Sequence, residues 1–182
     1  ALLLAGNTVF GLNYFGIGSL WLWPDWPELS ARIAPMGVMV AVVAGTRFTR
    51  TTLVVREVSP ALDAVLRAAG AAALLGLAAF ASGVVGYRFA QVLVTALGIV
   101  VTVIVLPICM LRARRGDAVA NYMLLGWAAY SAGAIATAAL LRGLVEPTFW
   151  TQHVYPLSTL VEMAAWMAVL GQRVKSIHGN AD

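Results

Sequence analysis

The chain has 182 residues, of which 61% are hydrophobic and 11% are charged, and its mean hydropathy is +0.86. Soluble domains carry about 25% charged residues, and a soluble fold of this size could not hide so much apolar surface from water. The composition therefore argues against a soluble enzyme, a disordered tail and a nucleic-acid-binding domain. The formal net charge of +4 says less about partners than the positions of the charges do. Because apolar residues run from Ala1 to about Val174, we expect one transmembrane helical domain over residues 1–182.

Six apolar runs have about the 20 residues that a membrane-crossing helix needs. They read approximately Leu2–Trp23, Leu29–Leu53, Pro60–Ser82, Tyr87–Leu111, Asp117–Arg142 and Val154–Val174. None shows the alternation of apolar and polar residues that is typical of a membrane β-barrel strand. The predicted fold class is therefore all-α, a polytopic transmembrane helix bundle of about six membrane-spanning helices.

The gaps between these runs hold residues that end or begin helices. The first run ends at Pro24, because proline cannot continue the hydrogen-bond ladder of a helix. Ser59 followed by Pro60 predicts a capped helix start, with Asp63 at the positive end of the helix dipole. Asp63 and Arg67 are four residues apart, which predicts an ion pair within that helix. The segment from Gly83 to Gly86 separates the third run from the fourth, and the segment 114–116 separates the fourth from the fifth.

The basic residues predict the orientation of the chain. With six spans, both ends lie on one side of the membrane, and nine of the 12 basic residues lie on that side: Arg47, Arg50, Arg56, Arg67, Arg112, Arg114, Arg115, Arg173 and Lys175. The opposite side holds Arg32, Arg88 and Arg142 together with an aromatic belt made of Trp21, Trp23, Trp26, Tyr87, Phe149, Trp150 and Tyr155. The positive-inside bias therefore places both ends of the segment in the cytoplasm.

Glu162 is the candidate for a functional side chain, because it lies near the middle of the last apolar run. A charged carboxylate at that depth is costly, so we expect a largely neutral side chain. Ser158 lies one turn away on the same face, and Asn13, Tyr130 and Ser131 are expected at a similar depth on other helices. Two interpretations stay open: a polar cluster that switches the arrangement of the helices, or a protonated acid that only fixes their packing.

The sequence has none of the motifs of an enzyme. It contains no nucleophile elbow, zinc-protease motif, phosphate loop or metal-spaced His/Cys cluster, and Cys109 is its only cysteine. We expect no enzymatic activity, no metal and no cofactor. Small residues in the third and fifth runs, including the pairs Ala72/Gly76 and Ala129/Gly133, favour close helix packing within the chain over a dimer contact.

Two stretches carry a resemblance to a known family. The first holds Phe48-Thr49-Arg50, then Leu53, then Pro60-Ala61-Leu62-Asp63; the second runs from Gly116 through Ala120, Tyr122 and Trp127 to Gly143-Leu144 and on to Glu162, Leu170 and Arg173. Together they resemble the membrane domain of bacterial seven-transmembrane receptors with diverse intracellular signalling modules. The resemblance implies seven helices, so this chain resembles a truncated copy without the first helix. It begins at Ala1 without an initiator methionine, and we expect it to be a piece of a longer protein.

The function that follows is a sensor or receptor domain that relays a signal across the bacterial inner membrane. The resemblance implies a cytoplasmic histidine kinase or diguanylate cyclase module beyond this chain, to which Arg173 and Lys175 would form the connection. The lipid bilayer is the expected partner, a second copy of the chain is a candidate partner, and nucleic acid is not expected. Two alternatives stay open: a small permease or channel, and a passive anchor that dimerises an output domain.

Overall fold

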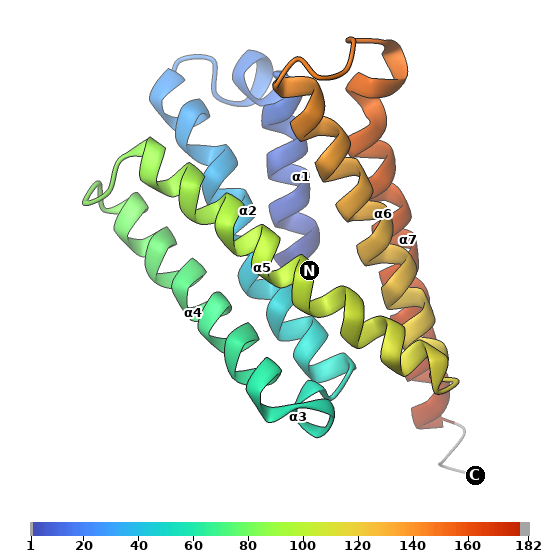
Figure 1. Cartoon of the computed structure of the whole chain (residues 1–182). Helices are drawn as coiled ribbons and strands as arrows, with labels where there is room; N and C mark the ends of the chain where they lie inside the picture. The colour runs from blue at the N-terminus through green and yellow to red at the C-terminus, as the bar shows by residue number, and fades with distance from the viewer. Residues whose placement is uncertain (1, 179–182) are drawn as a thin grey trace. The chain divides into compact units, whose positions relative to one another are not determined.

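The computed structural model describes the backbone of residues 2–178 and the side chains of residues 5–140 and 142–172. It is helical, and no strand occurs in the described part (Figure 1). In chain order the elements are α1 (Leu2–Tyr14), the π-helix η1 (Gly18–Leu22), α2 (Pro27–Thr52), α3 (Val55–Val58), α4 (Pro60–Ala81), α5 (Tyr87–Arg114), α6 (Ala118–Leu141) and α7 (Phe149–His178). The predicted all-α helical fold is confirmed.

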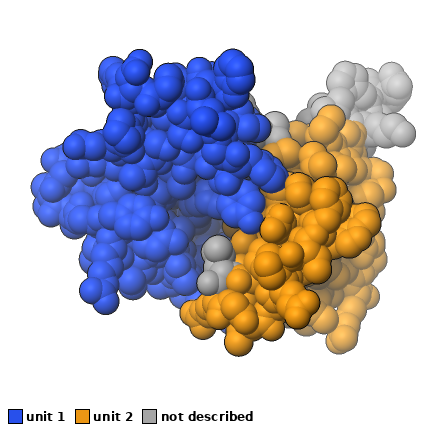
Figure 2. Space-filling view, turned by 90° about the horizontal axis from the view of Figure 1, so that it is seen from above, with its two compact units in different colours: residues 1–104 blue, residues 105–182 orange. Residues whose placement is uncertain are grey.

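The helices fall into two compact units, residues 1–104 and residues 105–182, and the boundary lies inside α5 (Figure 2). The first unit contains α1 to α4 and the larger part of α5. The second contains the last turns of α5 together with α6 and α7. The single domain expected over residues 1–182 stays a prediction.

Within the described residues, five helices are long and apolar enough to cross a membrane: α2, α4, α5, α6 and α7. The last four of these helices have large apolar side chains on their surfaces, among them Leu75, Val103, Ile135 and Met167, which are 65–71% exposed. Water would penalise so many exposed apolar groups, whereas lipid accepts them. The structure is therefore that of a multi-pass membrane protein.

The first predicted span, Leu2–Trp23, is not one continuous helix. The α-helix ends at Tyr14, and the chain passes through Gly16 with a φ of +72° before η1 begins. Only glycine takes that left-handed backbone conformation without strain, and the Gly16 N–H donates to the carbonyl of Asn13 as in a helix end (3.1 Å). The apolar run was long enough for a span, but the glycine within it allows a break.

Close backbone approaches hold the first unit together. Helices α1 and α2 pack side by side where Gly6 meets Gly37, and a Cβ on Gly6 would lie 2.8 Å from the Gly37 carbonyl oxygen. On the other side, α2 packs against α4. Met39 of α2, Phe80 of α4 and Ala90 of α5 form a buried apolar cluster. Small residues thus let the helices meet closely, as helix packing in lipid requires.

The predicted helix boundaries largely match the caps in the structure. The Ser59 hydroxyl accepts a hydrogen bond from the Leu62 N–H (3.4 Å), and the Asp117 carboxylate accepts from the N–H groups of Val119 and Ala120 (3.0 and 3.3 Å). The last helix begins at Phe149 instead of Val154. The hydroxyl of Thr148 accepts from the Thr151 N–H (3.3 Å), a capping signal that apolarity alone does not reveal.

Candidate functional site

The candidate site is the contact between α6 and α7, which run side by side in the second unit (Figure 1). Two glycines of α6 make the contact close. A Cβ on Gly126 would lie 2.9 Å from Nε1 of Trp166, and a Cβ on Gly133 would overlap the Ser158 side chain. Since the α6 residue number rises as the α7 number falls, the two helices are antiparallel, and their register places Tyr130 opposite Glu162. We call this contact the α6–α7 seam.

Glu162 is buried in the seam, with 3% of its surface exposed. Its Oε2 atom is buried and has no hydrogen-bond partner among the described residues. The side chains of Tyr130 and Tyr155 both interact electrostatically with this carboxyl group. A buried carboxyl with a free oxygen is rare in proteins and costly in a dry environment. The Oε2 atom of Glu162 is therefore available to a hydrogen-bond donor.

Aromatic rings surround this carboxyl. Tyr130 and Tyr155 share a hydrogen bond between their hydroxyl groups, and their ring centroids are 5.9 Å apart. The Trp127 ring packs edge-on against Tyr130, with centroids 6.1 Å apart, and lies tilted against Trp166, with centroids 6.2 Å apart. Tyr155 was expected in an interfacial belt, but the structure places its ring inside the seam. Because rings are large and rigid, a shift of α7 must repack several of them together.

The two predicted serines lie near Glu162 but bond to their own helices. The Ser158 hydroxyl donates to the Tyr155 carbonyl (2.7 Å), and the buried Ser131 hydroxyl donates to the Trp127 carbonyl (2.6 Å). Their donor hydrogens are thus used within each helix. Ser158 contributes to the seam by its contact with Gly133.

The other predicted site residues are not among the described side chains of the second unit. Asn13 belongs to the first unit, where its side-chain oxygen accepts a hydrogen bond from Ser30 (3.0 Å). Arg173 and Lys175 lie on the last turns of α7, and their side chains are outside the described residues. The described part of the site therefore consists of Glu162, Tyr130, Ser131 and Ser158, together with Tyr155, Trp127 and Trp166, which the sequence reading did not assign to it.

The N-terminal part of α7 contains a helix irregularity next to Glu162. Pro156 lies inside the helix and cannot donate the backbone hydrogen bond of its position. The hydroxyl groups of Ser158 and Thr159 donate to the carbonyls of Tyr155 and Pro156 (2.7 and 2.8 Å). Proline and back-bonding hydroxyls are recognised causes of helix bends. This places a deformable segment about one turn before the buried carboxyl.

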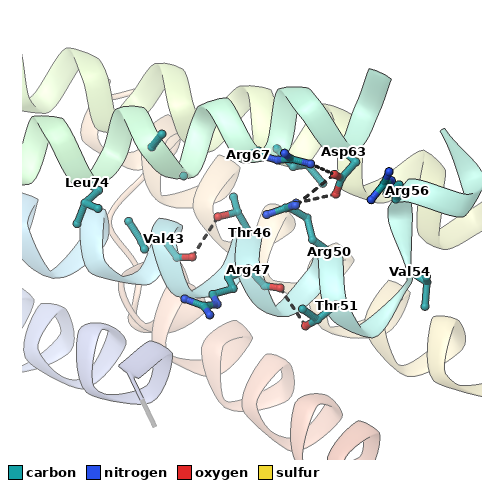
Figure 3. A pocket seen from close by; sticks show the side chains of 13 residues that line it. Val43, Thr46, Arg47, Arg50, Thr51, Val54, Arg56, Asp63, Arg67 and Leu74 are labelled. Atoms are coloured by element: carbon teal, nitrogen blue, oxygen red, sulfur yellow. Dashed lines mark hydrogen bonds and ion pairs between the residues drawn. The ribbon is translucent and has the colours of Figure 1, made fainter. Parts of the chain in front are cut away.

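A second polar cluster lies in the first unit, where α2 ends and α4 begins (Figure 3). Asp63 accepts hydrogen bonds from Arg50 Nε to Oδ1 (2.6 Å), from Arg50 Nη2 to Oδ2 (3.2 Å) and from Arg67 Nη2 to Oδ2 (2.8 Å). The predicted pair of Asp63 with Arg67 is present. The shorter contact with Arg50 was missed, although both residues belong to the quoted motif stretches, because sequence spacing does not reveal contacts between helices.

The geometry offers no metal site in the described chain, where no three His, Cys, Asp or Glu side chains lie close enough to share an ion. Cys109 is a free, fully buried thiol. What the α6–α7 seam contains is a buried carboxyl, that of Glu162, with one oxygen that has no hydrogen-bond partner among the described residues. The fold and the seam define a multi-pass helical membrane protein with a buried acid between two closely packed helices.

The chain belongs to the family described as 7TM diverse intracellular signalling, whose model matches residues 1–173. This confirms the resemblance drawn from the two motif stretches. The family is one of sensory receptor domains, so the chain is a receptor domain of membrane signal transduction. No curated protein and no solved structure matches it.

Proposed function

We propose that this domain relays a signal across the bacterial inner membrane by a movement of α7 against α6. A stimulus would favour one of two packings of the seam, and α7 would carry the change towards Arg173 and Lys175. A ligand can shift such an equilibrium only if it binds the two packings with different affinity. A stimulus that acts here must therefore contact groups that move with the seam.

The observation that carries the proposal is the unpartnered Oε2 of Glu162 in the buried seam. A carboxyl that served only to join two helices would be expected to have its oxygens satisfied. A free oxygen beside Tyr130 leaves a second hydrogen-bonded arrangement accessible. The glycines at 126 and 133 support the same reading, because they bring the two helices so close that a small movement of α7 changes the contacts along the seam.

The Pro156 segment supports a movement that is local to one end of α7. The missing backbone hydrogen bond at Pro156 weakens the helix nearly two turns before Glu162. A stimulus at that end of the bundle could bend α7 there, while its later turns move as a rigid rod. The displacement would then be nearly as large at the end of α7 as it is near Glu162.

The remaining parts of the proposal follow from the family and from the charges. Both ends of the segment lie in the cytoplasm, and a histidine kinase or diguanylate cyclase module follows α7 in the full receptor. The domain itself relays and does not catalyse. Lipid surrounds it, and a second copy would align two output modules.

Glu162→Gln in the full-length receptor tests the relay. Glutamine keeps the shape of glutamate and can donate and accept a hydrogen bond, but it cannot become charged. We expect the variant to change basal or stimulated output by about twofold or more, since coupling effects of single residues are roughly 0.5–2 kcal/mol. Output is measured as kinase autophosphorylation or cyclic dinucleotide production at matched membrane levels.

Glu146→Gln is the matched control, because Glu146 lies exposed in the loop before α7. It makes the same chemical change outside the seam, and its output should equal that of the wild type. If Glu162→Gln also signals like the wild type at both basal and stimulated levels, the carboxyl serves packing only and the relay proposal fails.

A further inference from the structure

The first unit contains a groove that the relay does not use. It has a volume of about 480 Å³ and lies between the end of α2, the α3 segment and the beginning of α4 (Figure 3). This volume falls within the range of small-molecule sites. Four arginines line it, Arg47, Arg50, Arg56 and Arg67, against the single carboxylate of Asp63. Its lining therefore has a formal charge of +3.

The carboxylate does not cancel this charge at the mouth of the groove. Asp63 is buried, with 5% of its side chain exposed, and both of its oxygens are occupied by Arg50 and Arg67. Arg67 is 64% exposed, so part of its guanidinium faces outward. Arg47 and Arg56 have no carboxylate within ion-pair distance among the described side chains. The groove thus offers guanidinium donors that an anion could bind.

Asp63 also gives the cluster a fixed geometry. Its two hydrogen bonds to Arg50 hold that guanidinium in a forked contact. Because Asp63 also binds Arg67 (2.8 Å), Arg50 at the end of α2 and Arg67 in the first turns of α4 are held in position before any ligand arrives. Arginine forks match the oxygens of a phosphate group, and a preorganised site loses less entropy on binding.

The groove continues from the arginines onto an apolar surface. Val43, Gly70, Ala71 and Leu74 line this part, one to two helical turns away from the charged mouth. Leu74 is 56% exposed, and Gly70 lies so close to Thr46 that a Cβ there would be 2.9 Å from its hydroxyl oxygen. A charged mouth joined to an apolar channel matches an amphiphile better than a fully polar ion.

We propose that this groove binds one anionic phospholipid, with its phosphate among the arginine side chains of the groove and an acyl chain along Ala71 and Leu74. The group that the arginines would recognise is a phosphate, which a lipid headgroup and a soluble phosphate compound both carry. The apolar continuation favours a lipid as its source over a soluble phosphate. Basic pockets between membrane helices recognise lipid headgroups in this way.

Lipid binding to the purified full chain in neutral detergent micelles tests the proposal. Native mass spectrometry is used to titrate phosphatidylglycerol, with phosphatidylcholine as the zwitterionic comparison and glycerol 3-phosphate as the soluble probe. We expect one phosphatidylglycerol to bind about tenfold or more tightly than phosphatidylcholine, and its affinity to fall as salt increases. Equal affinities for the two lipids would overturn the proposal.

The double variant Arg47→Gln/Arg56→Gln identifies the site. Neither residue contributes to the Asp63 ion pairs, so the cluster stays intact, and we expect about tenfold weaker binding of phosphatidylglycerol. Arg88→Gln/Arg115→Gln removes the same charge from exposed positions outside the groove and should leave the affinity unchanged. If both double variants lost the same affinity for phosphatidylglycerol, the lipid would respond to the overall charge of the protein, and this result would contradict a binding site in the groove.

Ala71→Trp separates the two sources of phosphate. The exposed Ala71 lies in the apolar part of the groove, and a tryptophan there would fill the path of an acyl chain. We expect this variant to bind phosphatidylglycerol several-fold more weakly. Competition by glycerol 3-phosphate at concentrations similar to those of the lipid, unaffected by Ala71→Trp, would assign the groove to soluble phosphates and overturn the lipid assignment.

Discussion

At the scale of single residues, carboxyl and hydroxyl groups behave differently in these helices. The hydroxyls of Thr46, Ser131 and Ser158 donate to carbonyls of their own helices, so each is satisfied without a partner helix. Glu162 has no such local solution, and its Oε2 stays unpartnered among the described residues. This difference explains why a carboxyl in an apolar run is a clear sequence signal, whereas the serines around it carry little information about contacts.

Asp63 is the residue at which we expect a single truncation to affect stability. Asp63→Ala would leave Arg50, which is 26% exposed, without its carboxylate, whereas Arg67→Ala would remove a largely exposed partner. We expect the thermal unfolding midpoint in detergent to fall at least about twice as far for Asp63→Ala as for Arg67→Ala. Circular dichroism on heating measures both midpoints.

A double variant checks that the effect comes from the Arg50–Asp63 contact. Arg50→Ala combined with Asp63→Ala should destabilise the protein by less than the sum of the two single changes. In the double variant neither Arg50 nor Asp63 remains as a charge that has lost the other. Strictly additive effects would show that the two residues act independently in spite of the 2.6 Å contact.

At the scale of whole helices, glycine sets the distance between α6 and α7. Gly133→Val would introduce a branched side chain where even a Cβ overlaps Ser158. We expect Gly133→Val to lower the free energy of unfolding by about 1–3 kcal/mol, as other insertions into packed contacts do. Ala132→Val makes a similar addition on the exposed side of the same helix and should stay within about 0.5 kcal/mol. Unfolding in mixed micelles compares the two, and similar losses would contradict the seam.

The helices also show how far sequence reasoning reaches. Apolar length and capping residues located α2, α4, α5 and α6 closely, because proline, serine, aspartate and glycine act locally on the backbone. The break between α1 and η1 depends on the backbone conformation of Gly16. The composition of the apolar run does not determine that conformation. The early start of α7 depends on the Thr148 cap.

At the scale of the whole molecule, contacts between helices were beyond the sequence reading. Arg50 and Asp63 are 13 residues apart on two helices, and no helical period connects them. The same limit holds for Asn13, whose side-chain oxygen accepts a hydrogen bond from Ser30, a contact between helices that sequence spacing does not reveal. Depth in the membrane can be read from an apolar run, whereas the neighbour at that depth depends on the arrangement of the helices.

The orientation of the chain in the membrane gives the last prediction, since it depends on the distribution of all 12 basic residues. In a background with Cys109→Ala, we expect Arg115→Cys, in the turn after α5, to react with an impermeant maleimide only after the inner membrane is opened. Val84→Cys and Leu144→Cys, in the exposed turns before α5 and before α7, should react in intact spheroplasts. The positive-inside bias is the physical reason, because arginine-rich loops stay in the cytoplasm. The reverse labelling pattern would place the arginine groove and the end of α7 outside the cell, where α7 could not drive a cytoplasmic module.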